Sequence, residues 1–396
     1  MTVVSVNCRC PKKYFASVPN CYYKRGSSMV ASKEKLTIRD LRARAVVVPL
    51  GRPVATKVGE FAEWPLILID LYTDEGVTGH GYLAPYIRQS VAYITPTLYD
   101  IAKLMRGQEV APFQTYQKAR ASLRLVGYQG VSMMAVAGFD MACWDVLAKA
   151  AGVPLVTLLG GTIEPVKAYN SNGLGLMSPD RVAAEALELL AEGDFKALKV
   201  RVGRETLAQD IAALRNVRKA VGNDVILVCD FNQGLSLGEA MRRCRALDSE
   251  DVYWIEEPIA YDDLDGNAKI ARETATPIQI GENFYGPRAM YQAIAAGACD
   301  YVMPDLMRIG GVTGWLRAAA IADAAGIEMS THLYPEISSH LMRVTATAHW
   351  LEWQDWAHPI LAEPFKVADG HIHIRNVPGN GLDWNEDAVS RYGLDV

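Results

Sequence analysis

A rhythm of short apolar runs, each ending in a polar residue, constrains the fold of this chain more than any other feature. Helical patterns separate most of these runs, which end at Asn170, Arg201, Asp230, Glu257, Glu282, Asp305, His332 and Glu352. Eight strand–helix units of about 20–31 residues are too many for an open sheet of ordinary size and suit a closed barrel. We therefore predict an α/β fold with a (β/α)8-type TIM barrel over residues 161–360.

The segment before the barrel has a different pattern. Strand-like runs at 36–38, 43–50 and 65–72 precede helical patterns at about 87–106 and 114–151. Strands followed by helices predict an α+β domain over residues 37–160. We expect residues 1–36 to be a poorly ordered N-terminal extension, whose first 28 residues are either an over-extended translation or a loose arm, and residues 361–396 to pack back on the α+β domain.

Charge and composition exclude several classes of function. The chain has 40 Lys and Arg against 45 Asp and Glu, so its net charge is −5. This slightly acidic balance gives no indication of binding to nucleic acid or to an anionic membrane. The most apolar region, residues 131–149, carries Asp140 and Asp145, so we expect no membrane span. Seven scattered cysteines do not form a disulfide framework and favour a reducing, cytoplasmic location.

Three carboxylates recur at a regular spacing on successive strands. Asp230, Glu256 and Glu282 are each separated by 26 residues, which is one strand–helix unit. Strand ends of a barrel meet at one rim, where three unpaired carboxylates would raise one another's pKa. Oxygen ligands without thiolate or imidazole suit Mg²⁺. We therefore predict a Mg²⁺ site at these three residues.

Other charged residues lie at the same predicted rim. Lys199 and Arg201 share one face of a strand because strand side chains alternate. Asp305 and His332 end neighbouring strands, and a carboxylate beside an imidazole makes a general base. Glu352 ends the last strand among apolar residues, so we expect burial to raise its pKa enough for it to donate a hydrogen bond or a proton.

From about Arg42 to its C-terminus the chain resembles the enolase superfamily, in particular the mandelate racemase subgroup. The resemblance rests on five ordered motifs: Gly138-Phe-Asp-Met-Ala-Cys-Trp-Asp145, Trp254-Ile-Glu-Glu-Pro258, Met303-Pro-Asp305, Ile309-Gly-Gly-Val-Thr-Gly-Trp315 and His349-Trp-Leu-Glu352. It implies a barrel covered by an N-terminal capping domain. By analogy alone, we also expect a homo-oligomer.

The resemblance also implies roles for individual residues. It makes His332 with Asp305 the base, Glu352 the acid beside the substrate carboxylate, and Lys199 the lysine that neutralises that carboxylate. Residues 52–65 resemble the capping loop that sets specificity. The implied substrate-binding residues are Asn232, Thr56, Val58 and Ser171.

One departure from the racemase pattern concerns Arg201. The pattern has Lys-x-Lys, with the second lysine as a base on the other face of the substrate, and a guanidinium does not deprotonate. We therefore rank one-base dehydration of an acid sugar ahead of racemisation of a mandelate-type 2-hydroxy acid. A barrel that binds a carboxylate without converting it is a third reading.

The specificity loop itself has mixed character. Lys57, Glu60, Glu63 and, after the last strand, Gln354 suit a polyol, whereas Val54, Val58, Phe61 and Trp64 suit an aryl group.

Overall fold

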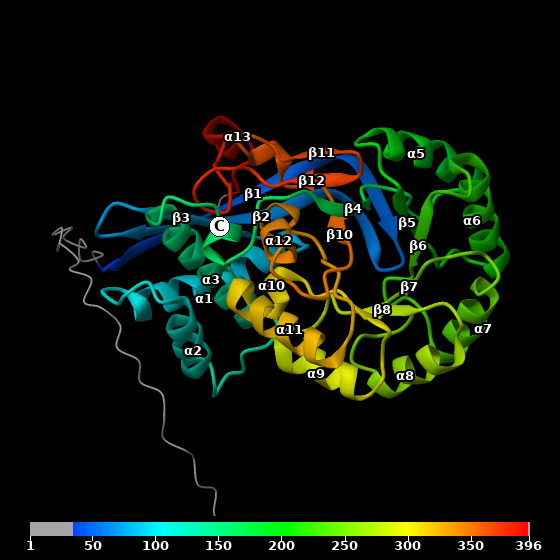
Figure 1. Ribbon diagram of the computed structural model, residues 1–396, viewed down its shortest axis with the longest axis horizontal. Coiled ribbons are helices and arrows are strands. Elements are labelled where there is room, and N and C mark those ends of the chain that lie inside the picture. The colour runs from blue at the N-terminus through cyan, green and yellow to red at the C-terminus, as the bar shows by residue number, and fades with distance from the viewer. Residues whose placement is uncertain (1–34, 395–396) are drawn as a thin grey trace, which may run out of the picture. The chain divides into compact units, whose positions relative to one another are not determined.

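In the computed structural model, which describes residues 35–394, parallel strands close a barrel (Figure 1). Its consecutive strands are β4 (Val166–Asn170), β5 (Ala197–Arg201), β6 (Ile226–Asp230), β7 (Ile255–Glu256), β8 (Ile278–Ile280) and β9 (Tyr301–Val302). Met329 continues the ring through parallel bridges to Val302 and Ala348, and β10 (Leu351–Trp353) pairs with β4. The predicted barrel is confirmed, although the strand before His332 is reduced to isolated bridges.

Helices cover the outside of this barrel. They are α5 (Pro179–Ala191), α6 (Leu207–Val221), α7 (Leu237–Leu247), α8 (Leu264–Glu273), α9 (Pro287–Ala295), α10 (Leu306–Ile309), α11 (Gly311–Ala325) and α12 (Pro335–Met342). Their starts follow local chemistry: Thr206 and Gln209 form a capping box that opens α6. Directly after β10 the chain forms the short 3₁₀ helix η1 (His358–Ile360) and then β11, so a full helix does not follow this strand at once.

The N-terminal domain is an antiparallel sheet packed on helices. Its strands are β1 (Ile38–Thr56), β2 (Gly59–Thr73) and β3 (Thr78–Leu83), and its helices are α1 (Arg88–Met105), α2 (Pro112–Ser122), α3 (Val131–Ala150) and α4 (Leu155–Leu158). The single helix predicted at 114–151 is wrong, because Gly127 and Gly130 adopt left-handed φ angles of 93° and 58° between α2 and α3. The capping loop predicted at 52–65 is the tip of the long β1–β2 hairpin.

Helix α3 forms the centre of this domain. It is long and apolar enough to span a membrane by length and composition, but 83% of its apolar window is buried inside the protein. Strand β3 approaches it closely, since a Cβ on Gly79 would lie 2.2 Å from the carbonyl oxygen of Ala142. The apolar character of α3 therefore serves the protein core.

The C-terminal segment contacts both domains. Strands β11 (Lys366–Ala368) and β12 (His371–His373) extend the sheet beside β4, and α13 (Glu386–Arg391) follows. Trp384 donates from Nε1 to Asp70 of β2 at 2.7 Å, and the amide of Val47 donates to the carbonyl of Tyr392 at 2.9 Å. Of the predicted N-terminal extension, residues 1–34 lie outside the described part of the chain.

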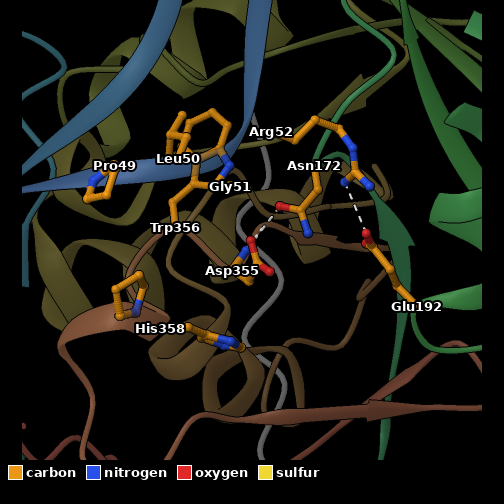
Figure 2. Close-up of a pocket in the computed structure, with 10 residues that line it drawn as sticks. Pro49, Leu50, Gly51, Arg52, Asn172, Glu192, Asp355, Trp356 and His358 are labelled. Atoms are coloured by element: carbon orange, nitrogen blue, oxygen red, sulfur yellow. Dashed lines mark hydrogen bonds and ion pairs between the residues drawn. The ribbon is translucent and has the colours of Figure 1, made fainter. Parts of the chain in front are cut away.

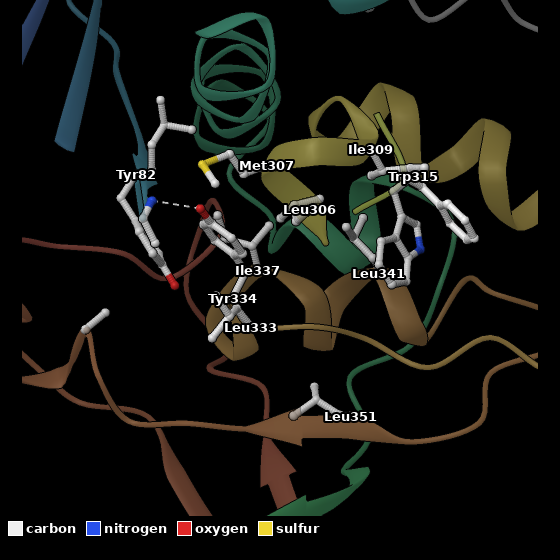
Figure 3. Packing of buried hydrophobic residues seen from close by; sticks show 14 of the residues in the cluster. Tyr82, Leu306, Met307, Ile309, Trp315, Leu333, Tyr334, Ile337, Leu341 and Leu351 are labelled. Atoms are coloured by element: carbon white, nitrogen blue, oxygen red, sulfur yellow. Dashed lines mark hydrogen bonds between the residues drawn. The ribbon is translucent and has the colours of Figure 1, made fainter. Parts of the chain in front are cut away.

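The N-terminal domain and the barrel meet through buried aromatic and acidic side chains. Tyr82 of β3 stacks on Tyr334 with ring centroids 4.8 Å apart, as Figure 3 shows. The Tyr82 hydroxyl donates to Glu336 Oε2 at 2.7 Å, whereas Glu336 Oε1 is buried without a partner. Burial raises the pKa of Glu336 to about 7.

This raised pKa predicts how stability depends on pH. A folded-state pKa of about 7 lies above the ordinary value of 4.5, so the stabilising effect of protonating Glu336 is full below pH 4.5 and is lost as pH rises through 7. Glu336→Gln should remove this dependence. Between pH 4.5 and 8 the wild type should lose about 3 kcal/mol more unfolding free energy than the variant.

Denaturant titration of both proteins across this pH range measures the difference. Glu205→Gln changes an exposed glutamate of the same type and serves as the matched control. Parallel pH profiles for wild type and Glu336→Gln would contradict the assignment.

Candidate active site

The charged residues predicted at the barrel rim all lie at the carboxyl ends of the barrel strands. Lys199 and Arg201 lie on β5, Asp230 ends β6, Glu256 ends β7 and Glu352 lies in β10. Glu282 and Asp305 follow β8 and β9 by two and three residues, and His332 follows the bridges at Met329 by three. All eight residues are buried, with at most 9% of each residue exposed. The parallel register of the barrel therefore gathers them at one end, as the sequence predicts.

Lys199 is the centre of one half of this cluster. Its Nζ lies 2.7 Å from Glu352 Oε1, 2.9 Å from Glu256 Oε1 and 3.2 Å from Asp230 Oδ2. Burial opposes the charge, but the three carboxylates outweigh it and hold the pKa of Lys199 well above its usual value. Lys199 is therefore a firmly protonated cation.

The expectation of a raised pKa for Glu352 is wrong. Burial acts in that direction, but Lys199 and His332 outweigh it and lower the pKa to about 2. The backbone amide of Leu333 also donates to Glu352 Oε2 at 3.0 Å. Glu352 is therefore an ionised hydrogen-bond acceptor in this structure.

His332 and Asp305 form the second half of the cluster. Nδ1 of His332 lies 2.8 Å from Asp305 Oδ2, and Nε2 lies 3.2 Å from Glu282 Oε2. Burial lowers the pKa of His332, but Glu282, Glu352 and Asp305 together raise it to about 9. Asp305 fixes the ring so that Nε2 points to the interior of the site, which is the geometry of an oriented base.

Arg201 is held in place by main-chain acceptors. Its Nη1 donates to the carbonyl oxygens of Gly173 at 2.8 Å and of Ser171 at 3.3 Å, and its Nη2 donates to Ser171 Oγ at 3.2 Å. Ser171 was predicted to bind substrate, yet it is fully buried and does not line the cavity described below. The structure places Ser171 behind Arg201, where it orients the guanidinium.

A cavity of about 270 Å³ opens onto these groups. The β1–β2 hairpin forms one side of it with Val54, Thr56, Val58, Phe61 and Trp64, so the predicted Thr56 and Val58 do face the cavity. Lys199, Arg201, Asp230, Glu282, His332 and Glu352 form the floor.

Asn232 also lines this cavity. Its amide nitrogen donates to Asp230 Oδ2 at 2.8 Å, while its Oδ1 is buried without a partner. That oxygen is free to accept a hydrogen bond from a bound hydroxyl.

The structure adds two ionisable residues to the predicted site: Glu257, which the sequence places at a strand end without a role, and Arg308, which the sequence reasoning missed. Glu257, with a left-handed φ of 39°, accepts from Asn283 Nδ2 at 3.1 Å, and burial together with Glu282 and Asp230 raises its pKa well above the usual range. Arg308 of α10 donates to the carbonyl of Glu282 at 3.0 Å and lies 3.3 Å from Glu282 Oε1. Arg308 follows Asp305 by three residues, so a search limited to strand ends does not find it.

The three predicted metal ligands share this region but have separate cationic partners. Lys199 contacts Asp230 and Glu256, and Arg308 contacts Glu282. Within residues 35–394 no three Asp, Glu, His or Cys side chains already converge as a metal centre. Their roles as ligands are therefore still predictions.

A second, larger cavity of about 520 Å³ lies beside the first, and Figure 2 shows its residues. Arg52 of β1 reaches α5 and pairs with Glu192 at 3.0 Å. Trp356 lines both cavities and packs against Trp64 with ring centroids 4.5 Å apart. The ion pair fastens the hairpin to the barrel close to its tip, so the tip is held over the smaller cavity, which contains the charged groups.

Comparison with known proteins agrees with this architecture. Residues 181–388 match the family model described as enolase C-terminal domain-like, and residues 38–160 match that of the mandelate racemase / muconate lactonizing enzyme N-terminal domain. The chain belongs to the enolase superfamily. Within the superfamily it falls in the mandelate racemase/muconate lactonizing enzyme subgroup, as its motifs predict.

Several superfamily members resemble the chain over nearly its whole length. The crystal structure of an enolase from alpha proteobacterium BAL199, with bound magnesium, is 56% identical with a TM-score of 0.89 and covers 91% of this chain and 100% of its own. An enolase from Bradyrhizobium complexed with magnesium and mandelic acid is 43% identical, with a TM-score of 0.87 over 91% and 99% of the two chains.

Among curated relatives, L-talarate/galactarate dehydratase from Salmonella typhimurium is 29% identical over 375 residues, 93% of this chain and 94% of the relative. The protein is an enolase-superfamily enzyme, and its relatives include both dehydratases and epimerases.

Proposed function

We propose that this enzyme is a Mg²⁺-dependent acid-sugar dehydratase that uses His332 as its single base. The observation that carries the proposal is the asymmetry of the cavity floor. The His332–Asp305 pair provides a proton acceptor, whereas Arg201, held by Ser171 and Gly173, provides a fixed cation in place of a second base. Dehydration requires one base, and racemisation through a planar intermediate requires an acceptor or donor on each face.

The donor set fits Mg²⁺. Asp230, Glu256 and Glu282 offer only carboxylate oxygens, which is the ligand type that Mg²⁺ prefers. Asp230 and Glu282 line the cavity, whereas Glu256 is fully buried against Lys199. The pKa of Glu257, next to Glu256 in the chain, is raised by burial and then by Glu282 and Asp230, as expected where carboxylates crowd together. Crystal structures of the BAL199 and Bradyrhizobium relatives contain magnesium. When bound, the metal would stabilise the negative charge that develops on the substrate carboxylate.

The chain's own residues account for the remaining chemistry. Lys199 is a buried cation beside the region where the substrate carboxylate binds, so it neutralises charge there. His332 Nε2 removes the α-proton and Asp305 stabilises the resulting imidazolium.

The β-hydroxyl then leaves with the proton that His332 has gained. One C–H bond and one C–O bond break, one water forms, and the enol product rearranges to a 2-keto-3-deoxy acid.

A mandelate-type racemase is the second candidate, and the aromatic wall of the cavity favours it. Phe61 and Trp64 lie with ring centroids 5.8 Å apart, and Trp356 packs on Trp64. Such a wall suits an aryl group. The Bradyrhizobium relative binds mandelic acid, whereas a crystallised L-talarate/galactarate dehydratase variant binds L-glucarate.

Proton NMR in D₂O with Mg²⁺ distinguishes the candidates. The purified enzyme is screened against acid sugars and both enantiomers of mandelate. Formation of a 2-keto-3-deoxy acid supports dehydration. Equilibration of the mandelate enantiomers contradicts the proposal and favours the racemase, and α-hydrogens that neither exchange nor leave across the panel favour a barrel that only binds carboxylates.

Arg201→Lys tests the one-base route directly. A lysine beside Lys199 has its pKa lowered by the neighbouring cation and can accept a proton, which a guanidinium does not do. We expect this variant to gain epimerisation at the α-carbon at least tenfold above the wild-type background. Arg201→Met is the matched control because it has no titratable group. Equal epimerisation by wild type and Arg201→Lys would show that Arg201 does not limit the reaction.

A further inference from the structure

We propose that a pocket between the N-terminal domain and the barrel, separate from the active site, binds a small multivalent oxyanion such as phosphate. The pocket has a volume of about 430 Å³. Arg120 comes from α2, Arg288 from α9 and Arg317 from α11, and we call these three residues the arginine pocket. The inference is independent of the proposed function because none of the three lines the active-site cavity.

The positive charge of the arginine pocket has no matching acid. Its lining contains no Asp or Glu, and among residues 35–394 no carboxylate forms an ion pair with any of the three arginines. Arg120 Nε is buried without a hydrogen-bond partner. The buried Arg243 elsewhere in the barrel, by contrast, pairs with Asp210 at 2.6 Å and with Glu239 at 2.5 Å.

Asp140 is an acid that Arg317 acts on at longer range. Burial dominates there and raises the pKa of Asp140 to about 7, and its Oδ2 accepts from the amide of Thr313 at 2.8 Å. Among the described residues, Asp140 thus accepts from the Thr313 amide and forms no ion pair with Arg317. Like charges gathered in one pocket repel one another, and an anion that joins them relieves this repulsion.

Aromatic rings hold two of the guanidinium groups in place. Arg120 lies 4.2 Å from the ring centroid of Tyr128 and 5.5 Å from that of Tyr116, and Arg317 lies 4.9 Å from Tyr116. Stacking fixes the planes of these groups without using their N–H donors. The donors are thus preorganised for a ligand.

The pocket also contains the start of helix α9. This helix of nine residues begins at Pro287, and Gly286 precedes it without a side-chain cap. The helix dipole favours an anion at this end. Pro287 has no N–H and the amide of Ala289 donates to the carbonyl of Gly286 at 3.1 Å, so this end adds the dipole and the amide of Arg288. The helix start and the three arginines therefore present donors to the same space from both domains.

An anion in this pocket would join the N-terminal domain to the barrel, because Arg120 and Tyr128 belong to the former and Arg288 and Arg317 to the latter. Ligand binding to the folded state alone raises the unfolding temperature in a saturable way. The expected consequence of the site is a phosphate-dependent gain in thermal stability.

Inorganic phosphate is the probe, added to the full chain at constant ionic strength with chloride as the balancing salt. We expect a saturable rise in Tm of about 2–4 °C in the wild type. The Arg288→Gln/Arg317→Gln double variant should lose this rise, and its phosphate affinity by calorimetry should fall at least about tenfold.

The control is Arg181→Gln/Arg272→Gln, which removes the same charge from exposed positions outside the pocket and should respond to phosphate as the wild type does. Arg288 is exposed, so Arg288→Gln alone keeps the test valid if the double variant does not fold.

Three outcomes would overturn the proposal. The first is a wild-type Tm that is the same in phosphate and in chloride. The second is a phosphate-dependent rise in Tm that is equal in the wild type and the double variant. This second result would mean that phosphate binds elsewhere, for example in the active site. The third is a double variant that dissociates in chloride alone, measured by light scattering. That result would mean that a carboxylate from a second copy of this chain fills the pocket.

Discussion

His332→Asn is expected to reduce kcat by about 10³- to 10⁴-fold, at the upper end of what a positioned general base contributes. Asparagine retains a polar group near Asp305 but has no nitrogen that accepts a proton. Because Nε2 of His332 is the one oriented acceptor that we identify on the cavity floor, the exchange of the substrate α-hydrogen with D₂O should fall by the same factor.

The matched variant is Asp305→Asn, which leaves the imidazole in place. Asp305 acts on the reaction through the imidazole ring of His332 and is a positioning residue, so we expect a smaller fall in kcat than in His332→Asn. Asp305 is also one of the groups that raise the pKa of His332. The apparent pKa of the base in the pH profile of kcat should therefore be lower in Asp305→Asn. Exchange that survives at the wild-type rate in His332→Asn would mean that another group removes the proton.

Glu256→Gln is expected to weaken Mg²⁺ binding at least about 100-fold and to abolish turnover at ordinary Mg²⁺ concentrations. The prediction follows from the position of Glu256, which shares Lys199 with Asp230 and lies in regular register with the other two predicted ligands. Calorimetric titration with Mg²⁺ measures the affinity without reference to any substrate.

Glu257 provides a control within the same dipeptide. Asn283 Nδ2 lies 3.1 and 3.4 Å from the two carboxyl oxygens of Glu257 and donates to them, whereas Glu256 contacts Lys199. Glu257→Gln should therefore change the Mg²⁺ affinity less than tenfold. A larger loss in Glu257→Gln than in Glu256→Gln would assign the ligand to the second glutamate of the pair.

Much of the site was predictable because a barrel converts sequence spacing into position. Asp230, Glu256 and Glu282 follow one another at one strand–helix unit, and parallel strands bring their ends to one rim whatever the intervening helices contain. The His332–Asp305 pair follows from the same rule. The family motifs then identified the superfamily.

Other features depend on contacts that no local pattern encodes. The low pKa of Glu352 results from Lys199, which lies 153 residues earlier in the chain but 2.7 Å away in space. Arg308 lies in the short helix α10 and donates to Glu282. The alternation of side chains along a strand does not predict a contact made from a helix. The break between α2 and α3 depends on two glycines with left-handed φ angles, a conformation that the helical periodicity on either side does not reveal.

The β1–β2 hairpin has a consequence for how such an enzyme changes over time. Thr56, Phe61 and Trp64 shape the cavity from the N-terminal domain, whereas every group that handles protons or charge belongs to the barrel. Substrate selectivity therefore depends on residues of the hairpin, whereas the reaction depends on residues of the barrel, and the two sets lie in separate parts of the sequence. Selection can alter which acids are accepted by exchanging a few hairpin residues while the reaction itself is retained, and a protein engineer can follow the same route by grafting residues 52–65 from a relative.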